Sequence, residues 1–259
     1  MAAPIVEVDG VALEYPSRDG PVPALRDVTL AVGEGDFVCV VGPSGCGKTS
    51  LLRIVAGFVT PTRGRVSLDG RPIGGPDHQR GVVFQQPTLY PWLSVEDNVA
   101  FGPRMRGVPA GERRALVERY LRLVGLWEFR RRATWELSGG QQQRVAIARV
   151  LANDPRILLM DEPFGALDAL TREHLQDELL KLWRATGKTV FFITHSVEEA
   201  CYLGTHVVVM SSRPGRILAT LEVPFSRTAA HGGSRAVKSH PEFVATREEV
   251  LSHIWAAAS

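Results

Sequence analysis

Apolar and polar residues alternate in short runs near the start of the chain, and turn residues separate these runs. Residues 5–8, 12–15 and 65–69 alternate in this way, and Asp-Gly pairs stand at 9–10 and 69–70. A period of two bounded by Asp-Gly is typical of antiparallel strands joined by tight turns. We therefore expect a small antiparallel β lobe at the N-terminus.

A second class of runs is apolar at every position. These runs cover residues 37–41, 157–160, 190–193 and 207–210. They predict strands buried on both faces of a parallel sheet, which helices must cover. Leucines at helical spacing between residues 175 and 182 predict one crossover helix between two of these strands. The expected fold class is therefore α/β.

The pattern divides the chain into a core, an insert and a tail. Between residues 87 and 150 the apolar residues recur at helical spacing and no strand is evident, which predicts an inserted helical lobe. The core then comprises residues 1–86 and 151–225. Residues 226–259 are more polar but retain apolar residues such as Phe243, which predicts a terminal helix packed on the core.

Composition excludes several classes of protein. The chain has 259 residues, of which 44% are hydrophobic and 22% charged, enough for one large domain and unlike a disordered protein. No apolar run approaches the roughly twenty residues that span a bilayer, and the first residues lack the basic start of a signal peptide, so we expect a cytoplasmic location. The three cysteines, Cys39, Cys46 and Cys201, lack metal-binding spacing and should be free thiols.

Nine arginines and three acidic residues lie between Arg104 and Arg132. Three interpretations of this run stay open: a solvated helical face, a surface for an anionic partner, or a nucleic-acid site. Only four of the 30 basic residues of the chain are lysines, and no interleaving of aromatic residues suggests base stacking. We therefore favour the solvated face and expect no nucleic-acid partner.

The apolar run at 37–41 leads directly into a glycine-rich loop of the form G-x-x-x-x-G-K-[ST], and a helical pattern follows. Such glycines let backbone N–H groups surround a phosphate, and the helix N-terminus adds its positive end. Lys48 would reach the β and γ phosphates, and the Thr49 hydroxyl would bind Mg²⁺. Cys46 is either a reactive thiolate or an inert filler of the loop. The binding set is Gly42, Pro43, Ser44, Gly45, Cys46, Gly47, Lys48, Thr49 and Ser50.

Two carboxylates follow the apolar run at 157–160. Ligands of open α/β folds bind at the carboxyl ends of sheet strands, where Asp161 and Glu162 would lie. Asp161 suits the Mg²⁺ shell, and Glu162 suits a general base or water-positioning role. Taken alone, the pair could equally be charges that cap a helix. His195 follows the run at 190–193 and should lie at the same edge.

A second candidate phosphate site is the sequence Leu137-Ser138-Gly139-Gly140-Gln141, which precedes a helical run at 142–151. Ser138 can cap that helix, and the two glycines leave its first amides open to an anion. Together with the glycine-rich loop and the acidic pair, in this order, the sequence resembles the ATP-binding-cassette (ABC) ATPases. The resemblance covers essentially the whole chain and implies a P-loop NTPase core with an N-terminal antiparallel β lobe and an inserted helical lobe.

The resemblance also implies roles for single residues. Tyr15 corresponds to the aromatic residue that stacks on adenine, although a half-buried sheet residue is the alternative. Gln85 corresponds to the glutamine that joins the lobes and contacts the metal. Asp168 belongs to the D-loop, and His195 to the switch that contacts the γ-phosphate. The family usually has serine before Ala-Leu-Asp, and Gly165 stands here, which puts that one hydroxyl contact in doubt.

By resemblance, the partners are a second copy of the chain and a membrane permease. Two copies would sandwich ATP between the glycine-rich loop of one and Ser138, Gly139, Gly140 and Gln141 of the other. Residues 89–93 form either a groove for a helix of the multispanning permease or ordinary packing of the lobe. A solute-binding protein would take part indirectly, and the chain would be peripheral at the cytoplasmic face of the inner membrane.

The resemblance is strongest to the subgroup of nitrate, sulfonate and taurine importers. Residues 81–85, 93–101, 161–168 and 193–200 carry it, and the tail at 234–248 is similar to that of taurine ATPases. Taurine is the expected solute, with aliphatic sulfonates next and nitrate or a thiamine precursor behind. The alternative class is a non-transport ABC ATPase that acts on nucleic acid or ribosomes.

Overall fold

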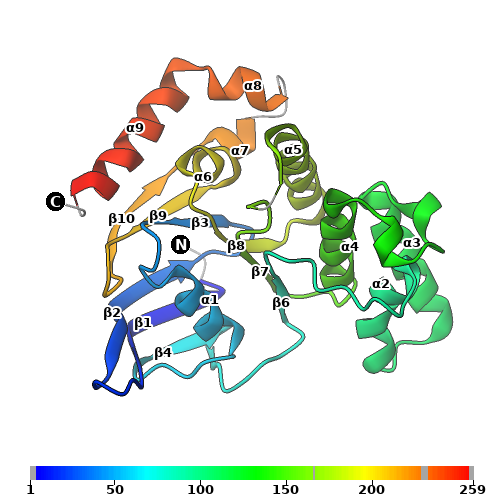
Figure 1. The fold of residues 1–259 in the computed structure, drawn as a ribbon, viewed down its shortest axis with the longest axis horizontal. Helices are drawn as coiled ribbons and strands as arrows, with labels where there is room; N and C mark the ends of the chain where they lie inside the picture. Colours follow the sequence, from blue (N-terminus) through cyan, green and yellow to red (C-terminus); the bar gives the residue numbers. More distant parts are fainter. Residues whose placement is uncertain (1–3, 166, 229–232, 257–259) are drawn as a thin grey trace. The chain divides into compact units, whose positions relative to one another are not determined.

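Figure 1 shows the fold in a computed structural model, which describes residues 4–165, 167–228 and 233–256. The chain divides into two compact units, one of residues 1–77 with 188–259 and one of residues 78–187. No helix in the described part of the chain combines the length and the apolar character that crossing a bilayer requires.

The first unit contains an antiparallel sheet and a second set of strands that pair mostly in parallel. The antiparallel sheet has the order β2-β1-β4-β5, and the second set has the order β10-β9-β3-β8. The elements are β1 (Val6–Tyr15), β2 (Val22–Val32), β3 (Phe37–Val41), α1 (Lys48–Ala56), β4 (Arg63–Leu68), β5 (Arg71–Pro72), β8 (Thr189–Ile193), α6 (Val197–Leu203), β9 (His206–Met210), β10 (Ile217–Glu222), α7 (Phe225–Thr228), α8 (Gly233–Lys238) and α9 (Pro241–Ala256).

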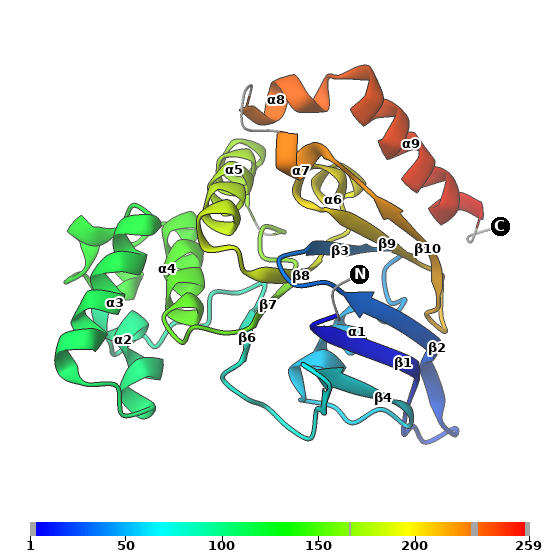
Figure 2. The same ribbon diagram turned by 180° about the vertical axis from the view of Figure 1, so that it is seen from behind.

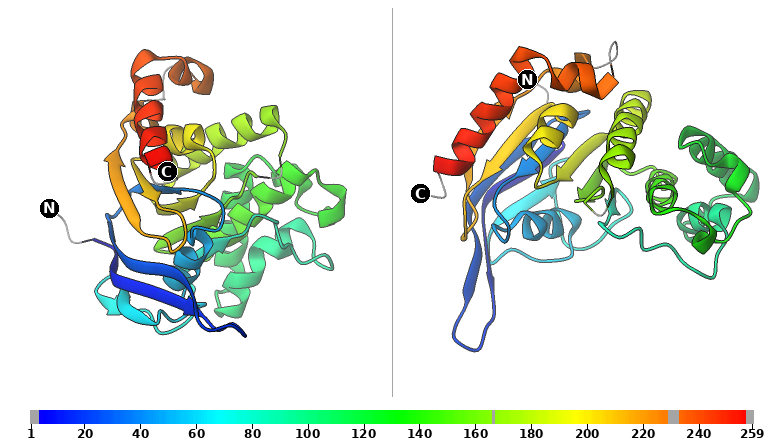
Figure 3. Two further views of the ribbon diagram at one scale, coloured as in Figure 1. Left: turned by 60° about the vertical axis from the view of Figure 1, so that its left-hand side comes forward. Right: turned by 45° about the horizontal axis from the view of Figure 1, so that its top comes forward.

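The antiparallel lobe differs from the prediction at Asp9-Gly10. β1 runs straight through this pair and forms one long ribbon with β2 (Figure 3). Gly10 adopts a left-handed conformation with φ 56°, and the register shifts between Val8 and Val11, so the pair makes a bulge and not a turn. The Asp-Gly pair at 69–70 does make the predicted turn, because β4 and β5 pair antiparallel across it.

The buried strands follow the apolar runs closely. β3 pairs in parallel with both β8 and β9, and every residue of β3 and β8 is buried. The predicted tail helix is α9, which packs against α6 and β9 (Figure 2). Phe243 of α9 is fully buried and meets the ring of Phe225 edge-on at 5.0 Å.

The second unit contains two parallel strands and the predicted helical lobe. Helices α2, α3 and α4 pack on one another, and β6 pairs in parallel with β7. The elements are β6 (Arg80–Val83), α2 (Val95–Met105), α3 (Ala110–Leu123), two 3₁₀ turns at Trp127–Phe129 and Thr134–Glu136, α4 (Gly139–Leu151), β7 (Ile157–Asp161) and α5 (Ala169–Thr186).

Candidate functional site

The candidate site residues fall in both units. The first unit holds Tyr15, the loop at 42–50 and His195. The second unit holds Gln85, the motif at 138–141, Asp161, Glu162 and Asp168. Most of these residues lie at or beside the ends of helices and strands.

The glycine-rich loop connects β3 to α1. Gly47 is the N-cap of α1 with φ 101°, no side chain caps this helix, and its first turn carries no acidic residue. Backbone N–H groups and the positive end of the helix dipole are therefore available to an anion. A Cβ at Gly47 would lie 2.8 Å from the backbone oxygen of Ala24, so only glycine permits this close approach. These features fit a bound phosphate group.

Lys48 supplies a positive charge inside this loop. Its side chain is buried, and Nζ donates hydrogen bonds to the backbone oxygens of Gly42 at 2.9 Å and Pro43 at 3.0 Å. A buried ammonium group needs such acceptors, and they hold its charge at the loop. Cys46 is also buried, with Sγ 3.9 Å from Nζ of Lys48. Because Cys46 is buried, we favour the interpretation that it is an inert residue that fills the loop over the interpretation that it is a reactive thiolate.

The strand register brings His195 to the edge where the loop begins. Val40 of β3 is paired with Ile193 of β8, so Gly42 and His195 each stand two residues beyond paired positions. The carboxyl ends of parallel strands meet at one edge of a sheet, where ligands of such folds bind. His195 is exposed at this edge.

Tyr15 lies at the end of β1, next to the first turn of α1. Its side chain is half-buried, and its hydroxyl oxygen lies 3.2 Å from Oγ of Ser50. The ring is thus held beside the helix that begins at the glycine-rich loop. An aromatic face in this place is suited to stacking on a base.

In the second unit the same register argument applies to β6 and β7. Val83 is paired with Met160, and Gln85 and Glu162 each stand two residues further on. A Cβ added to Gly165 would lie 3.2 Å from Nε2 of Gln85 and 3.7 Å from Oε2 of Glu162. The structure therefore brings Gln85, Glu162 and Gly165 together.

The backbone is unusual where the two carboxylates stand. Asp161 is the last residue of β7 and is half-buried. Glu162 has φ 47°, a left-handed conformation that is uncommon for a residue with a side chain. Such strained residues cluster at active sites, where the strain helps to aim a side chain.

Asp168 begins α5 as its N-cap. Its Oδ1 accepts a hydrogen bond from the backbone N–H of Thr171 at 3.0 Å. This hydrogen bond favours the ionised form and lowers the pKa of Asp168 below its ordinary value. Ala166, which belongs to the same D-loop, lies outside the described residues.

Ser138 and Gln141 cap α4 reciprocally. Oγ of Ser138 accepts from the backbone N–H of Gln141 at 3.3 Å, and Oε1 of Gln141 accepts from that of Ser138 at 2.9 Å. The helix begins at Gly139, three residues before the predicted run. Gly139 is exposed, and a Cβ at Gly140 would lie 3.1 Å from Cγ2 of Thr171. The two glycines thus keep this helix end open and close to α5.

The comparison with protein families decides where the chain belongs. A model of the family described as ABC transporter matches residues 25–165, more than half of the chain. The chain belongs to the ABC transporter family. It is 55% identical over 242 residues to the taurine import ATP-binding protein TauB of Roseobacter denitrificans, covering 93% of this chain and 90% of that one. It is also 55% identical over 249 residues to TauB of Chromobacterium violaceum, covering 96% and 95%.

Solved structures of ABC cassettes share the fold. A dimeric, post-hydrolysis state of the ATP-binding cassette MJ0796 bound to ADP and Pi has a TM-score of 0.73 and 34% identity, and the match covers 84% of this chain and 98% of that one. CbiO1 of Clostridium perfringens, part of the ABC transporter complex cbiONQ, has a TM-score of 0.78 and 28% identity, covering 96% and 100%. The predicted α/β fold of a P-loop NTPase is confirmed.

In this ABC family chain, hydrogen bonds and ring contacts hold the segment that follows Gln85. Asn98 is fully buried and holds Tyr90 by two hydrogen bonds, from the Tyr90 N–H at 2.9 Å and to the Tyr90 oxygen at 3.1 Å. The Tyr90 ring contacts the rings of Phe101 at 4.6 Å and Trp92 at 5.5 Å. Trp92 is nevertheless 75% exposed. An exposed tryptophan on a fixed backbone is a feature of interaction surfaces.

Two arginines at the site were not found from the sequence. Arg213 donates from Nε to the backbone oxygen of Gly45 at 3.2 Å, inside the glycine-rich loop. Arg149 lies over the Tyr90 ring at 5.2 Å and donates to the backbone oxygen of Thr88 at 3.0 Å. Burial lowers the pKa of Arg149 below its ordinary value. Neither belongs to a motif, and only strand order and helix packing bring them there.

The arginine-rich run covers aromatic rings of its own lobe. Aromatic rings do occur in and beside the run, contrary to the prediction that no aromatic residues are interleaved with it. The guanidinium carbons of arginines lie over these rings, 4.5 to 6.0 Å from the ring centroids. The pairs are Arg104 with Phe101, Arg119 with Tyr120, Arg122 and Arg130 with Trp127, and Arg132 with Phe129. These contacts place the named arginines against aromatic rings of their own lobe.

Proposed function

We propose that the chain is the ATP-hydrolysing, energy-coupling subunit of a membrane importer for taurine. The observation that carries the proposal is the likeness to taurine import ATP-binding proteins, which extends over nearly the whole chain. The uncapped helix N-terminus at Gly47 and the buried charge of Lys48 support ATP as the substrate.

Different residues at or near the strand ends bind the nucleotide, hold the metal ion and act in hydrolysis. Lys48 and the loop at 42–50 bind the triphosphate, and Tyr15 stacks on the adenine. Thr49, Gln85 and Asp161 would hold Mg²⁺, and the bound ion would neutralise charge on the phosphates. Glu162 orients the attacking water and accepts its proton, and His195 contacts the γ-phosphate. A positioned general base of this kind contributes about 10² to 10⁴ in rate.

The proposed function requires partner proteins. A second copy of the chain places Ser138, Gly139, Gly140 and Gln141 on the nucleotide held by the first, and Asp168 lies at the same interface. The exposed Trp92 and its ordered segment receive a multispanning permease. The chain then works as a peripheral protein at the cytoplasmic face of the inner membrane, and the solute-binding protein acts through the permease.

The ATPase part is tested with the purified chain. Glu162→Gln should bind ATP with the affinity of the wild type, lose at least about 10² in turnover, and accumulate as an ATP-bound dimer in size-exclusion chromatography. Lys48→Ala should instead lose ATP affinity. Turnover at the wild-type rate in the Glu162→Gln variant would remove the assignment of the base.

The partner is tested by affinity purification from native membranes. A tagged wild-type chain should co-purify with a multispanning membrane protein, and Trp92→Ala should lose that protein while keeping its ATPase activity. Trp255→Ala is a matched control, since Trp255 is also exposed but lies in α9. Recovery of ribosomes or nucleic acid in place of a membrane protein would contradict the proposal.

A further inference from the structure

The helix that follows His195 is fixed at its first turn. Ser196 is the N-cap of α6, and its Oγ accepts from the backbone N–H of Glu199 at 3.3 Å. The backbone N–H of Ser196 donates to Oγ1 of Thr194 at 3.0 Å. Ser196 makes both bonds, one within the first turn of α6 and one back across His195 to Thr194, so the position of His195 depends on how this turn is oriented.

Lys238 reaches this turn from the tail. Its Nζ lies 3.1 Å from Oε1 of Glu198 and 5.2 Å from the ring centroid of Tyr202. Glu198 and Tyr202 are one helical turn apart on α6, so one ammonium group contacts both. The Lys238 side chain is 11% exposed and that of Glu198 is 44% exposed, so solvent reaches this pair mainly from the side of the carboxylate.

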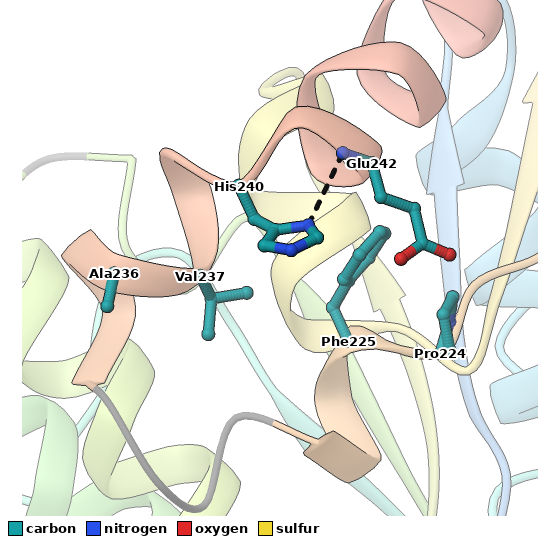
Figure 4. Close-up of a pocket in the computed structure, with 6 residues that line it drawn as sticks. All are labelled: Pro224, Phe225, Ala236, Val237, His240 and Glu242. Carbon is teal, nitrogen blue, oxygen red and sulfur yellow. Dashed lines mark hydrogen bonds between the residues drawn. The ribbon is translucent and has the colours of Figure 1, made fainter.

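An open pocket lies beside α8, next to this contact. A cavity of about 490 Å³ separates Pro224 and Phe225 from Ala236 and Val237 of α8 (Figure 4). His240 and Glu242 also line it, and the backbone N–H of Glu242 donates to Nδ1 of His240 at 3.4 Å (Figure 4). The charged contact of Lys238 links the last residue of α8 to α6 beside this pocket.

We propose that Lys238 is a positioning residue for ATP hydrolysis. Through Glu198 it fixes the first turn of α6 and with it the place of His195 at the carboxyl end of β8. The contacts that carry this role are those with Glu198 and Tyr202 on α6. The inference rests on the proposed function, because it needs His195 to contact the γ-phosphate.

The test is steady-state ATP hydrolysis by the full chain. Lys238→Met keeps the length of the side chain and removes its charge, and Glu198→Gln removes the partner charge. Each should lower kcat by about three- to tenfold with KM for ATP unchanged, and the double variant should be no slower than either single variant. Lys238→Arg should keep kcat within about twofold of the wild type.

Lys181→Met is the matched control. Lys181 forms an ion pair with Glu178 at 2.9 Å on α5, but its side chain is 71% exposed. This variant should keep the wild-type kcat, because exposed pairs contribute little. Thermal unfolding of every variant shows whether the chain is folded at the assay temperature.

Several results would overturn the inference. The first is a Lys238→Met variant that keeps the full kcat. The second is a double variant in which the effects of the two single variants multiply. The third is a loss of activity that follows the unfolded fraction alone. The last result would make Lys238 a structural residue only. A wild-type chain that does not hydrolyse ATP would refute the proposed function itself and remove the ground of the inference.

Discussion

Gly47→Ala places a methyl group where the glycine-rich loop lies against β2. Gly47 has φ 101°, and a left-handed conformation costs a residue with a Cβ about 1–2 kcal/mol. The new Cβ would lie 2.6 Å from Cδ2 of Leu25 and 2.8 Å from the backbone oxygen of Ala24. That oxygen is fixed, because it accepts the backbone N–H of Gly215 at 2.9 Å. The start of α1 must therefore shift.

The free energy of unfolding should fall by about 2–5 kcal/mol, the sum of the backbone strain and of about 1–3 kcal/mol for overpacking. Gly20→Ala is the matched control. Gly20 has φ 105°, but nothing lies within 4 Å of the position of its Cβ. This control carries the same backbone strain without the close contact, so the difference between the two variants measures the approach to Ala24.

The assay combines thermal unfolding with titration of a fluorescent ATP analogue. Gly47→Ala should melt about 3 °C or more below Gly20→Ala, since a chain of this size loses about 2–4 °C per kcal/mol. Its nucleotide affinity should be at least about tenfold weaker, which is 1.4 kcal/mol in binding. Equal melting temperatures and equal affinities in the two variants would refute the reasoning about this loop.

Two further predictions concern burial. All three cysteines are buried, and burial raises the pKa of two of them, that of Cys201 to about 12, so a thiol reagent at pH 8 should modify the chain only after denaturation. Rapid labelling of native Cys46 that ATP prevents would contradict this. Phe243→Ala should cost about 3–5 kcal/mol in urea denaturation, because the ring is fully buried, whereas Trp255→Ala should cost less than about 0.5 kcal/mol. Similar effects of the two would show that α9 is not packed as described.

The buried strands were predictable because every position in them is apolar. The run at 37–41 coincides with β3, and the run at 157–160 differs from β7 by one residue. β2 was not predicted, because its alternation breaks at Asp27, which has φ 52° and stands beside a register shift. A bulge changes the period of two locally, so the pattern of residues no longer indicates a strand.

Two candidate residues could be placed because they follow an apolar run in sequence. Glu162 and His195 were placed at strand ends in this way, and the strand register agrees with that placement. Gln85 was assigned by family resemblance alone, and the register puts it two residues beyond the last paired position of β6. Arg149 and Arg213 could not be found in this way. Their contacts with the Tyr90 segment and with Gly45 depend on helix packing and strand order, which no local pattern encodes.

Uptake of radiolabelled taurine tests the central claim most directly. A strain that lacks this chain is complemented with the wild type or with Glu162→Gln, at equal levels of expression. The wild type should restore taurine uptake and Glu162→Gln should not, because import requires ATP hydrolysis by this chain. Uptake that is equal in the two complemented strains, or restored uptake of nitrate or another sulfonate without that of taurine, would contradict the account.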